Sequence, residues 1–334
     1  MRAANIKTSS ARRLLAAAAI LGVSAAAQAQ SDAVLGQYYE VPSLYNPAAT
    51  GLTDNLRIRA AGRLQWVGID NAPRTFAGVA DMPVKLGNQR IAVGLKALQE
   101  SQGLYSTLDI GAQGAWKFRR FGGEWTVGLG VGIYDQSFKG TEVYIPDGDD
   151  YHQGSDTAIP TTDIHGTALD LDAGIFYSHR LFWAGVSMTH ITSPTVSMSS
   201  DSGSGSESGA KYTYKAPATL YFMAGCNIPL KNTLFDIVPS MMVASDFTFT
   251  TARLTAAVRY RKFLTFGVGY SWNDAVTATV SAKIRNFFIG YSYDYATTDI
   301  NRASSGSHEI VVGYSMQLNL GEKNKNRHKS VRIM

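Results

Sequence analysis

Clustered carboxylates are the first residues of this chain that suggest chemistry. Asp147, Asp149 and Asp150 lie together, and Asp156 and Asp163 follow nearby. Carboxylate oxygens are the ligands that Ca²⁺ prefers, although the spacing lacks the full pattern of a calcium-binding loop. A Ca²⁺ site and a solvated acidic loop are both open interpretations of this stretch.

A second constellation, Ser307-His308-Glu309, has the residue types of a hydrolase. Neighbours in an extended strand point to opposite faces, so these residues cannot form a nucleophile–base relay among themselves. The chain has no nucleophile elbow, P-loop, dinucleotide fingerprint or metalloprotease motif. Its single cysteine, Cys226, excludes an internal disulfide framework and a cysteine-rich metal centre. Apart from the open Ca²⁺ question, we expect no catalytic residue, cofactor or metal, and no enzyme.

Isolated charges also recur within segments that are otherwise apolar or small. Buried charges must be paired or wetted. The pattern therefore predicts an ion-pair network in the interior or, as the alternative, the lining of a ligand or ion path. The charges are Arg57, Arg59, Arg63, Asp81, Asp109, Asp170, Asp172, Arg253, Arg259, Lys283, Arg285 and Asp294.

A predicted secretion signal precedes, along the chain, the elements that must position these side chains. A pair of arginines precedes the apolar stretch 14–27, which ends in the small-x-small cleavage pattern Ala27-Gln28-Ala29. Residues 1–29 are thus predicted to be a signal peptide, and the mature chain works outside the cytoplasm. The remaining sequence has no run of about 18 apolar residues, which a membrane helix would need.

Strict alternation of apolar and polar residues indicates long strands. In 309–320, every second residue from Ile310 to Leu320 is apolar, and the residues between them are mostly small or polar. Such segments are about twice as long as the five or six residues usual in a soluble sandwich. At about 3.3 Å per residue and a tilt near 40°, each strand rises roughly 25–30 Å, the height of a lipid-facing band. The fold class predicted is all-β, an antiparallel transmembrane β-barrel of the outer-membrane type.

The alternation predicts about fourteen strands over residues 55–320. Pro239 lies inside one of them and argues against it, because proline cannot donate to a strand ladder. The predicted strands are 55–67, 74–84, 90–99, 106–118, 124–135, 167–177, 181–191, 218–229, 234–246, 251–261, 263–273, 275–286, 287–296 and 308–320.

The connections alternate between short and long. With a periplasmic N-terminus, the two longest, 136–166 and 192–217, both face the outside, as is typical of outer-membrane barrels. The second contains the Ser/Gly-rich stretch 199–209, which predicts a flexible loop. Both chain termini are then expected in the periplasm.

Residues 30–54 precede the first strand and cannot span the membrane. Pro42 and Pro47 interrupt any long strand, and aromatic residues such as Tyr38 and Tyr45 need burial. We expect this segment to fold into the periplasmic mouth as a plug or docking lip. Packing onto the base of the barrel is the alternative.

The basic charge of the chain lies at its ends. The sequence has 31 Lys and Arg against 26 Asp and Glu, and much of the excess falls in the signal peptide and in the tail 321–334. A basic nucleic-acid-binding domain is therefore not expected. The tail is either solvated or a handle for an acidic partner or anionic head groups.

Several motifs occur in order along the mature chain. They are Gln37-Tyr38-Tyr39, Tyr45-Asn46-Pro47-Ala48-Ala49-Thr50-Gly51, Arg63-Leu64-Gln65-Trp66-Val67-Gly68, Pro73-Arg74-Thr75, Gly290-Tyr291-Ser292-Tyr293-Asp294 and Gly306-Ser307-His308-Glu309-Ile310. This set resembles the PorP/SprF family of the type IX secretion and gliding motility system. Ala49 departs from family versions, which often have an aromatic residue there, and the basic tail is not a family hallmark.

The resemblance implies an outer-membrane barrel that assists export or surface attachment of partner proteins with C-terminal sorting domains, often large adhesins. It also implies contact with type IX secretion components, including a periplasmic protein linked to peptidoglycan, and no catalysis. The other expected partner is outer-membrane lipid. A porin or transporter for a small or hydrophobic solute is the alternative, and an outer-membrane enzyme assembled from distant residues is the third hypothesis.

The motif residues are the candidates for partner-binding or structural roles. They are Tyr45, Asn46, Pro47, Gly51, Arg63, Gln65, Trp66, Asp294, His308 and Glu309.

Overall fold

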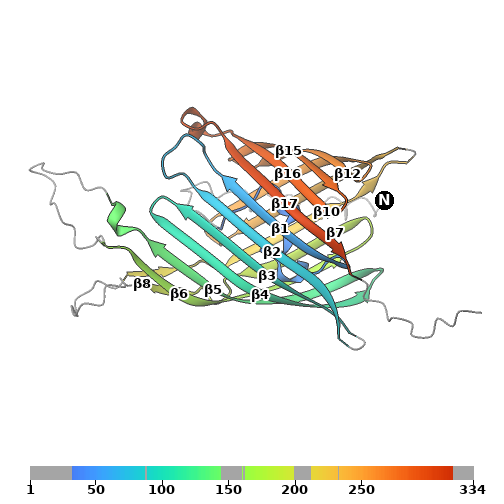
Figure 1. The fold of residues 1–334 in the computed structure, drawn as a ribbon, viewed down its shortest axis with the longest axis horizontal. Coiled ribbons are helices and arrows are strands. Elements are labelled where there is room, and N and C mark those ends of the chain that lie inside the picture. The colour runs from blue at the N-terminus through green and yellow to red at the C-terminus, as the bar shows by residue number, and fades with distance from the viewer. Residues whose placement is uncertain are drawn as a thin grey trace, which may run out of the picture.

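The computed structural model describes residues 32–86, 89–143, 160, 162–198, 212–231 and 233–318. Fourteen antiparallel strands close into a barrel (Figure 1). They are β1 (Asn55–Leu64), β2 (Arg74–Leu86), β3 (Gln89–Gln102), β4 (Tyr105–Arg120), β5 (Gly123–Phe138), β6 (Ile164–Ser178), β7 (Phe182–Thr189), β10 (Thr219–Cys226), β12 (Phe235–Ser245), β13 (Thr250–Tyr260), β14 (Leu264–Ser271), β15 (Ala275–Ile284), β16 (Phe287–Ala296) and β17 (Ser307–Gln317).

Each strand pairs with its neighbours along the chain, and the first strand pairs with the last. β17 lies antiparallel to β1 with Glu309 opposite Arg63, and β10 pairs with both β7 and β12. Each segment predicted from the alternation overlaps one of these strands. The prediction of an all-β transmembrane barrel of about fourteen strands is confirmed.

Alternate residues of each strand face outward or into the lumen, as the period of two requires. Phe76, Leu95 and Val268 point outward and are 57%, 62% and 63% exposed. Charged residues such as Arg63 and Asp81 point inward and are buried. An apolar outer surface around a polar interior is the arrangement of a barrel that sits in lipid.

Among the described residues, no helix has the length and apolar character that crossing a membrane would require.

Pro239 is accommodated because the neighbouring strand is interrupted beside it. β10 pairs with β12 only as far as Ser240, and the two-residue strand β11 (Ile228–Pro229) resumes the pairing at Ile237. Pro239 therefore lies opposite the break between β10 and β11. A residue without a backbone N–H can occupy such a position in a strand.

The connection 192–217 is not wholly a loop, and this part of the prediction is wrong. β8 (Thr195–Met198) and β9 (Tyr212–Lys215) form a two-stranded hairpin within it. Its apolar residues Val196 and Met198 are buried against Tyr134 of β5 and Ile164 of β6. The hairpin forms because its apolar side chains pack against the wall of the barrel.

Four sequence predictions concern segments that lie outside the described residues. They are the signal peptide 1–29, the acidic stretch Asp147–Asp150, the Ser/Gly-rich stretch 199–209 and the basic tail 321–334.

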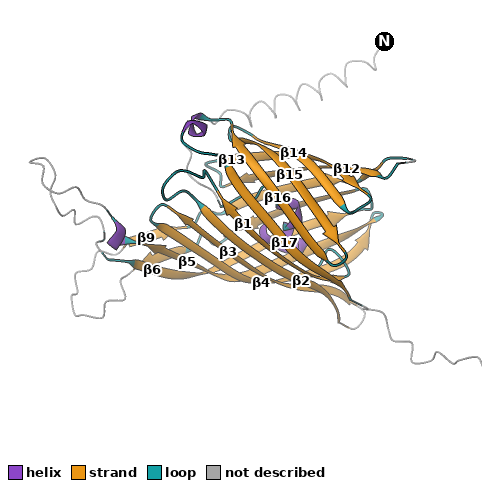
Figure 2. Ribbon diagram, turned by 45° about the horizontal axis from the view of Figure 1, so that its top comes forward, coloured by secondary structure: helices purple, strands orange, loops and turns teal. Residues whose placement is uncertain are grey.

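Residues 32–54, here called the inner segment, lie inside the barrel (Figure 2). They form three short helical turns, η1 (Tyr38–Glu40), α2 (Pro42–Tyr45) and η2 (Pro47–Ala49). Proline begins α2 and η2, where a backbone N–H would have no partner within the helix. Apolar side chains of the segment pack against lumen residues of the strands, among them Met223 and Met242.

The inner segment approaches the wall most closely where the strands carry glycine. A Cβ added at Gly128 of β5 would meet the backbone of Ala48. A Cβ added at Gly174 of β6 would meet the side-chain amide of Asn46. These glycines therefore make room for the backbone and cap of η2.

The substitution Gly128→Val tests this packing. The added side chain should displace η2 from the wall, at a cost of about 1–3 kcal/mol for overpacking, while the barrel still assembles. Chymotrypsin should then cleave the inner segment, which has several tyrosines, faster than in the unchanged protein.

Gly114→Ala is the matched control, because a Cβ at Gly114 would meet no atom within 4 Å. Equal cleavage rates in Gly128→Val and Gly114→Ala would contradict the close packing of η2.

Candidate functional site

Glu309 of β17 holds the beginning of the inner segment. Its carboxylate accepts hydrogen bonds from the backbone N–H groups of Gly36 and Gln37, at 2.6 and 2.8 Å. Arg63 Nη1 lies 3.4 Å from this carboxylate, and Arg63 Nη2 lies 2.6 Å from Asp294 Oδ2. Glu309, Arg63 and Asp294 form what we call the Glu309 anchor. All three are buried, so each charge depends on the others for compensation.

Asp81 of β2 holds the far end of the inner segment. Its Oδ1 accepts the backbone N–H of Gly51 at 2.9 Å, and its Oδ2 pairs with Arg57 at 2.9 Å. Lys117 of β4 donates to the carbonyl oxygen of Gly51. Gly51 has a φ of +64°, in the left-handed region that favours glycine. Asp81, Arg57 and Lys117 form the Asp81 anchor.

Asn46 connects the middle of the inner segment to two strands. Its side-chain oxygen accepts the N–H of Ala48 and caps η2, while its amide nitrogen donates to the carbonyl oxygens of Ile175 and Val186. Those carbonyls belong to β6 and β7. One side chain therefore fixes both the turn of the segment and its position against the wall.

The tyrosines of the inner segment are buried hydrogen-bonding groups. The hydroxyl of Tyr45 accepts the N–H of Leu35 at 2.9 Å, and its ring packs on Tyr221 with 5.3 Å between centroids. Tyr38 shares a hydrogen bond of 2.9 Å with Ser240 of β12. Burial raises the pKa of Tyr45 above the usual value of a phenol, because the charged phenolate would lose its solvation.

Two cavities lie on either side of the inner segment, each of about 520 Å³. The first faces the long connections and is lined by residues that include Asp32, Tyr134 and Tyr214. The second faces the short turns and is lined by Tyr39 and Leu52 of the inner segment, among other residues. Within the described part of the chain, the segment therefore divides the lumen into two compartments.

The structure brings most of the sequence-predicted site residues together around the inner segment. Tyr45, Asn46, Pro47 and Gly51 belong to the segment itself, and Arg63, Asp294 and Glu309 form one of its anchors, as described above. The other predicted residues do not join them, and they are Gln65, Trp66 and His308.

Those other residues face outward or lie at the rim of the barrel that carries the long connections. Trp66 has a φ of +49° in the turn after β1, where its N–H donates to Ser307 Oγ. The N–H of Gln65, in the same turn, donates to the carbonyl of Pro73. His308 shares a hydrogen bond of 2.7 Å with the hydroxyl of Tyr291, an outward residue. The adjacent residue Glu309 faces the lumen instead, as strand alternation requires.

Several residues that hold the segment were not among those predicted from the sequence. Lys117 and Gln113 of β4 both contact it, since Gln113 donates to the carbonyl of Ser43 and accepts from Thr50. Their positions on the polar face of the strand were a usable signal. They are about 60 residues from the inner segment in sequence, so the sequence alone did not indicate that they contact it.

The family model described as type IX secretion system membrane protein PorP/SprF matches residues 27–314. This span includes the inner segment and all barrel strands up to the last residues of β17. No curated protein matches the chain in sequence.

Solved structures resemble the chain only distantly. The Pseudomonas putida toluene transporter TodX is 12% identical, with 86% of this chain and 95% of that chain covered at a TM-score of 0.46. The translocator domain of the autotransporter NalP from Neisseria meningitidis is 14% identical, with 79% and 87% covered at 0.41. The Acinetobacter baumannii outer membrane protein Omp33 is 8% identical, with 79% and 99% covered at 0.40. Likenesses at this level transfer no activity to the chain.

Removing one member of the Glu309 anchor should release the inner segment. In Glu309→Ala, the N–H groups of Gly36 and Gln37 lose their acceptor, and each buried donor left unsatisfied costs about 1–3 kcal/mol. Arg63 keeps Asp294 as its partner. The conductance of single barrels in a planar bilayer should rise, because the segment no longer divides the lumen.

His308→Ala is the control, since His308 is adjacent in sequence but has no contact with the segment. Conductance that is as low in Glu309→Ala as in His308→Ala would show that the anchor does not hold the lumen shut.

Proposed function

The chain belongs to the PorP/SprF family of type IX secretion system membrane proteins, and from this premise we propose that it is an accessory barrel of the outer membrane. It assists the export or surface attachment of partner proteins that carry C-terminal sorting domains. It catalyses no reaction. The family match over residues 27–314 is the observation that carries this proposal.

The filled lumen supports an accessory role over transport. The inner segment is bound to several parts of the wall by buried polar contacts, through Glu309, Asp81 and the strand carbonyls that Asn46 contacts. A solute would have to break these contacts to cross from one cavity to the other. The porin or transporter hypothesis therefore requires movement of the segment, whereas docking of a partner protein requires none.

The opening of the barrel on the side of the short turns is positively charged, as a docking surface for an acidic partner would be. Its cavity is lined by the cations Arg57, Arg59, Arg259, Lys262 and Lys283 and by one acidic residue, Glu40. β1 begins and β17 ends at this side of the barrel. We assign this side to the periplasm, where the mouth would receive an acidic surface of a secretion component.

Affinity purification from native outer membrane tests the proposed function. The tagged protein should bring with it either a large surface protein with a C-terminal sorting domain or components of the secretion machinery, identified by mass spectrometry. Recovery of a lone barrel that conducts or takes up solute in liposomes would overturn the accessory role and favour the transporter.

Charge reversal at the short-turn mouth should weaken that association. The double substitution Lys262→Glu and Lys283→Glu reverses two exposed cations that line the cavity. Recovery of the periplasmic partner should fall by about tenfold, because like charges across an interface cost several kcal/mol.

Arg180→Glu with Lys231→Glu provides the matched control. Both residues are exposed in turns at the same side but do not line the cavity. An equal effect of the two double variants on recovery would argue against the cavity as the docking surface.

A further inference from the structure

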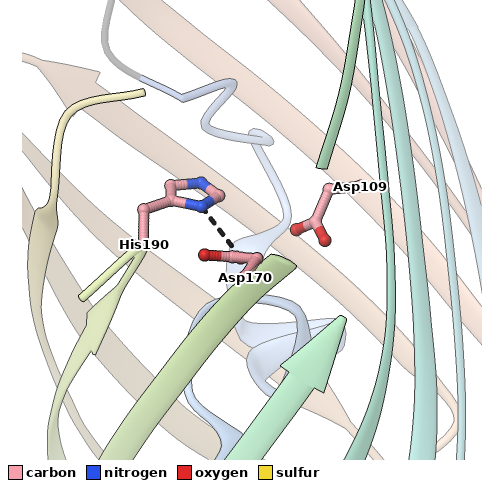
Figure 3. A group of neighbouring side chains, drawn as sticks. All are labelled: Asp109, Asp170 and His190. Atoms are coloured by element: carbon pink, nitrogen blue, oxygen red, sulfur yellow. Dashed lines mark hydrogen bonds and ion pairs between the residues drawn. The ribbon is translucent and has the colours of Figure 1, made fainter. Parts of the chain in front are cut away.

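A cluster of charged side chains lies in the lumen beside the cavity at the long-loop side (Figure 3). Asp109 comes from β4, Asp170 from β6, and His190 directly follows β7. One carboxylate oxygen of each aspartate and one ring nitrogen of His190 all lie within 4.8 Å of one another. The three side chains are turned toward each other, and none belongs to the Glu309 or Asp81 anchor.

Carboxylates outnumber cations in this cluster. Lys96 Nζ lies 2.7 Å from both Asp109 Oδ2 and Asp172 Oδ2. His190 lies between two further carboxylates, with Nδ1 2.9 Å from Asp170 and Nε2 3.4 Å from Asp32 of the inner segment. Even an imidazolium at His190 leaves the carboxylates in excess. An uncompensated buried charge is strongly unfavourable, so the cluster favours an additional cation.

Two buried oxygens of the cluster have no hydrogen-bond partner. No donor among the described residues reaches Asp109 Oδ1 or Asp170 Oδ1. Their residues are only 4% and 1% exposed. Leaving a buried acceptor unsatisfied costs about 1–3 kcal/mol, and more for a charged group. This observation is independent of the clustering, and it marks the lone pairs that a metal ion would accept.

The site also has room for water ligands. The cavity of about 520 Å³ is lined by Asp109 and His190 together with Asp32 and Tyr134. Its lining reaches the turn between β3 and β4, at Gly103 and Leu104. Water molecules in this cavity can complete the coordination shell of a cation that has three protein ligands.

We propose that Asp109, Asp170 and His190 bind one divalent first-row transition-metal ion in the lumen. Mixed imidazole and carboxylate ligation suits ions such as Zn²⁺ and Mn²⁺, whereas Ca²⁺ and Mg²⁺ prefer oxygen ligands alone. Each aspartate supplies one oxygen, and Nδ1 of His190 supplies the nitrogen ligand, so that the ion replaces the present contact of Nδ1 with Asp170 Oδ2. Lys96 keeps its contacts with Asp172 and with the other oxygen of Asp109.

The bound ion would join three parts of the wall and strengthen the inner segment. It connects β4, β6 and the end of β7. His190 also contacts Asp32 of the inner segment through Nε2, so the segment is linked to the same ion. Asp32 is also fixed by the hydroxyl of Tyr221, at 2.9 Å. The role is structural, and it stands independently of the proposed function in secretion.

Zinc titration of the purified full-length protein tests the site. The protein in detergent is first stripped with a chelator, and Zn²⁺ binding is then followed by calorimetry. One equivalent should bind per chain, with Ca²⁺ and Mg²⁺ as poor competitors. Asp109→Asn and His190→Gln should each weaken this binding by about tenfold or more, because even the loss of an outer-shell partner costs 10–100-fold.

The controls match the residue types but lie outside the cluster. His308→Gln removes an outward histidine, and Asp163→Asn removes an exposed carboxylate whose partner is Thr141. Both should bind Zn²⁺ as the unchanged protein does. Heat-dependent mobility in gels shows whether each variant keeps a folded barrel.

A Co²⁺ spectrum provides the second measurement. Visible absorption of the Co²⁺-loaded protein should report a nitrogen ligand, and it should change in His190→Gln. Absence of a stoichiometric Zn²⁺ equivalent in the unchanged protein would overturn the proposal even if the variants fail to fold. Binding that is equal in His190→Gln and His308→Gln would also overturn it.

Discussion

The pairing of charges inside a lipid-enclosed barrel is the constraint on which this structure depends. The outer face of each strand must be apolar, so the polar residues of the strands all point into one lumen. Charges that leave bulk water there require partners. Part of this requirement is met between strands, as in the contact of Arg63 with Asp294. Polar groups of the inner segment meet a further part, as where Glu309 and Asp81 accept its backbone N–H groups.

The inner segment and the wall satisfy each other's polar groups. Short helical turns leave backbone N–H and C=O groups without intrahelical partners. Next to these turns, Glu309 and Asp81 accept the N–H groups of Gly36 and Gly51, and Lys117 donates to the carbonyl of Gly51. Without the segment, Glu309, Asp81 and Lys117 would keep charged partners on the wall but lose these hydrogen bonds. Without the wall, the segment would hold unpaired backbone groups. This reciprocity explains how a stretch without long secondary structure keeps a defined place in the lumen.

The strands were predictable because alternation is a local property. The period of two identified which face of β17 carries Ile310 and which carries Glu309, and the structure agrees. Pro239 argued against a strand that exists, because the break between β10 and β11 cannot be read from β12 alone.

Contacts across the lumen were not predictable in the same way. The closure of the barrel places Arg63 opposite Glu309, although 246 positions separate them. That register depends on the stagger of the whole barrel, which no single segment encodes. His190 and Lys96 were missed for the same reason, since each acquires its partners only when distant strands meet.

Hydrogen–deuterium exchange of the folded protein in native membranes tests most directly that the inner segment is a fixed part of the barrel. The backbone amides of Gly36, Gln37, Ala48 and Gly51 all donate hydrogen bonds to side chains in the structure. Peptides covering residues 36–51 should therefore exchange as slowly as those from β17. Exchange of these peptides within seconds, as in a free chain, would contradict the account.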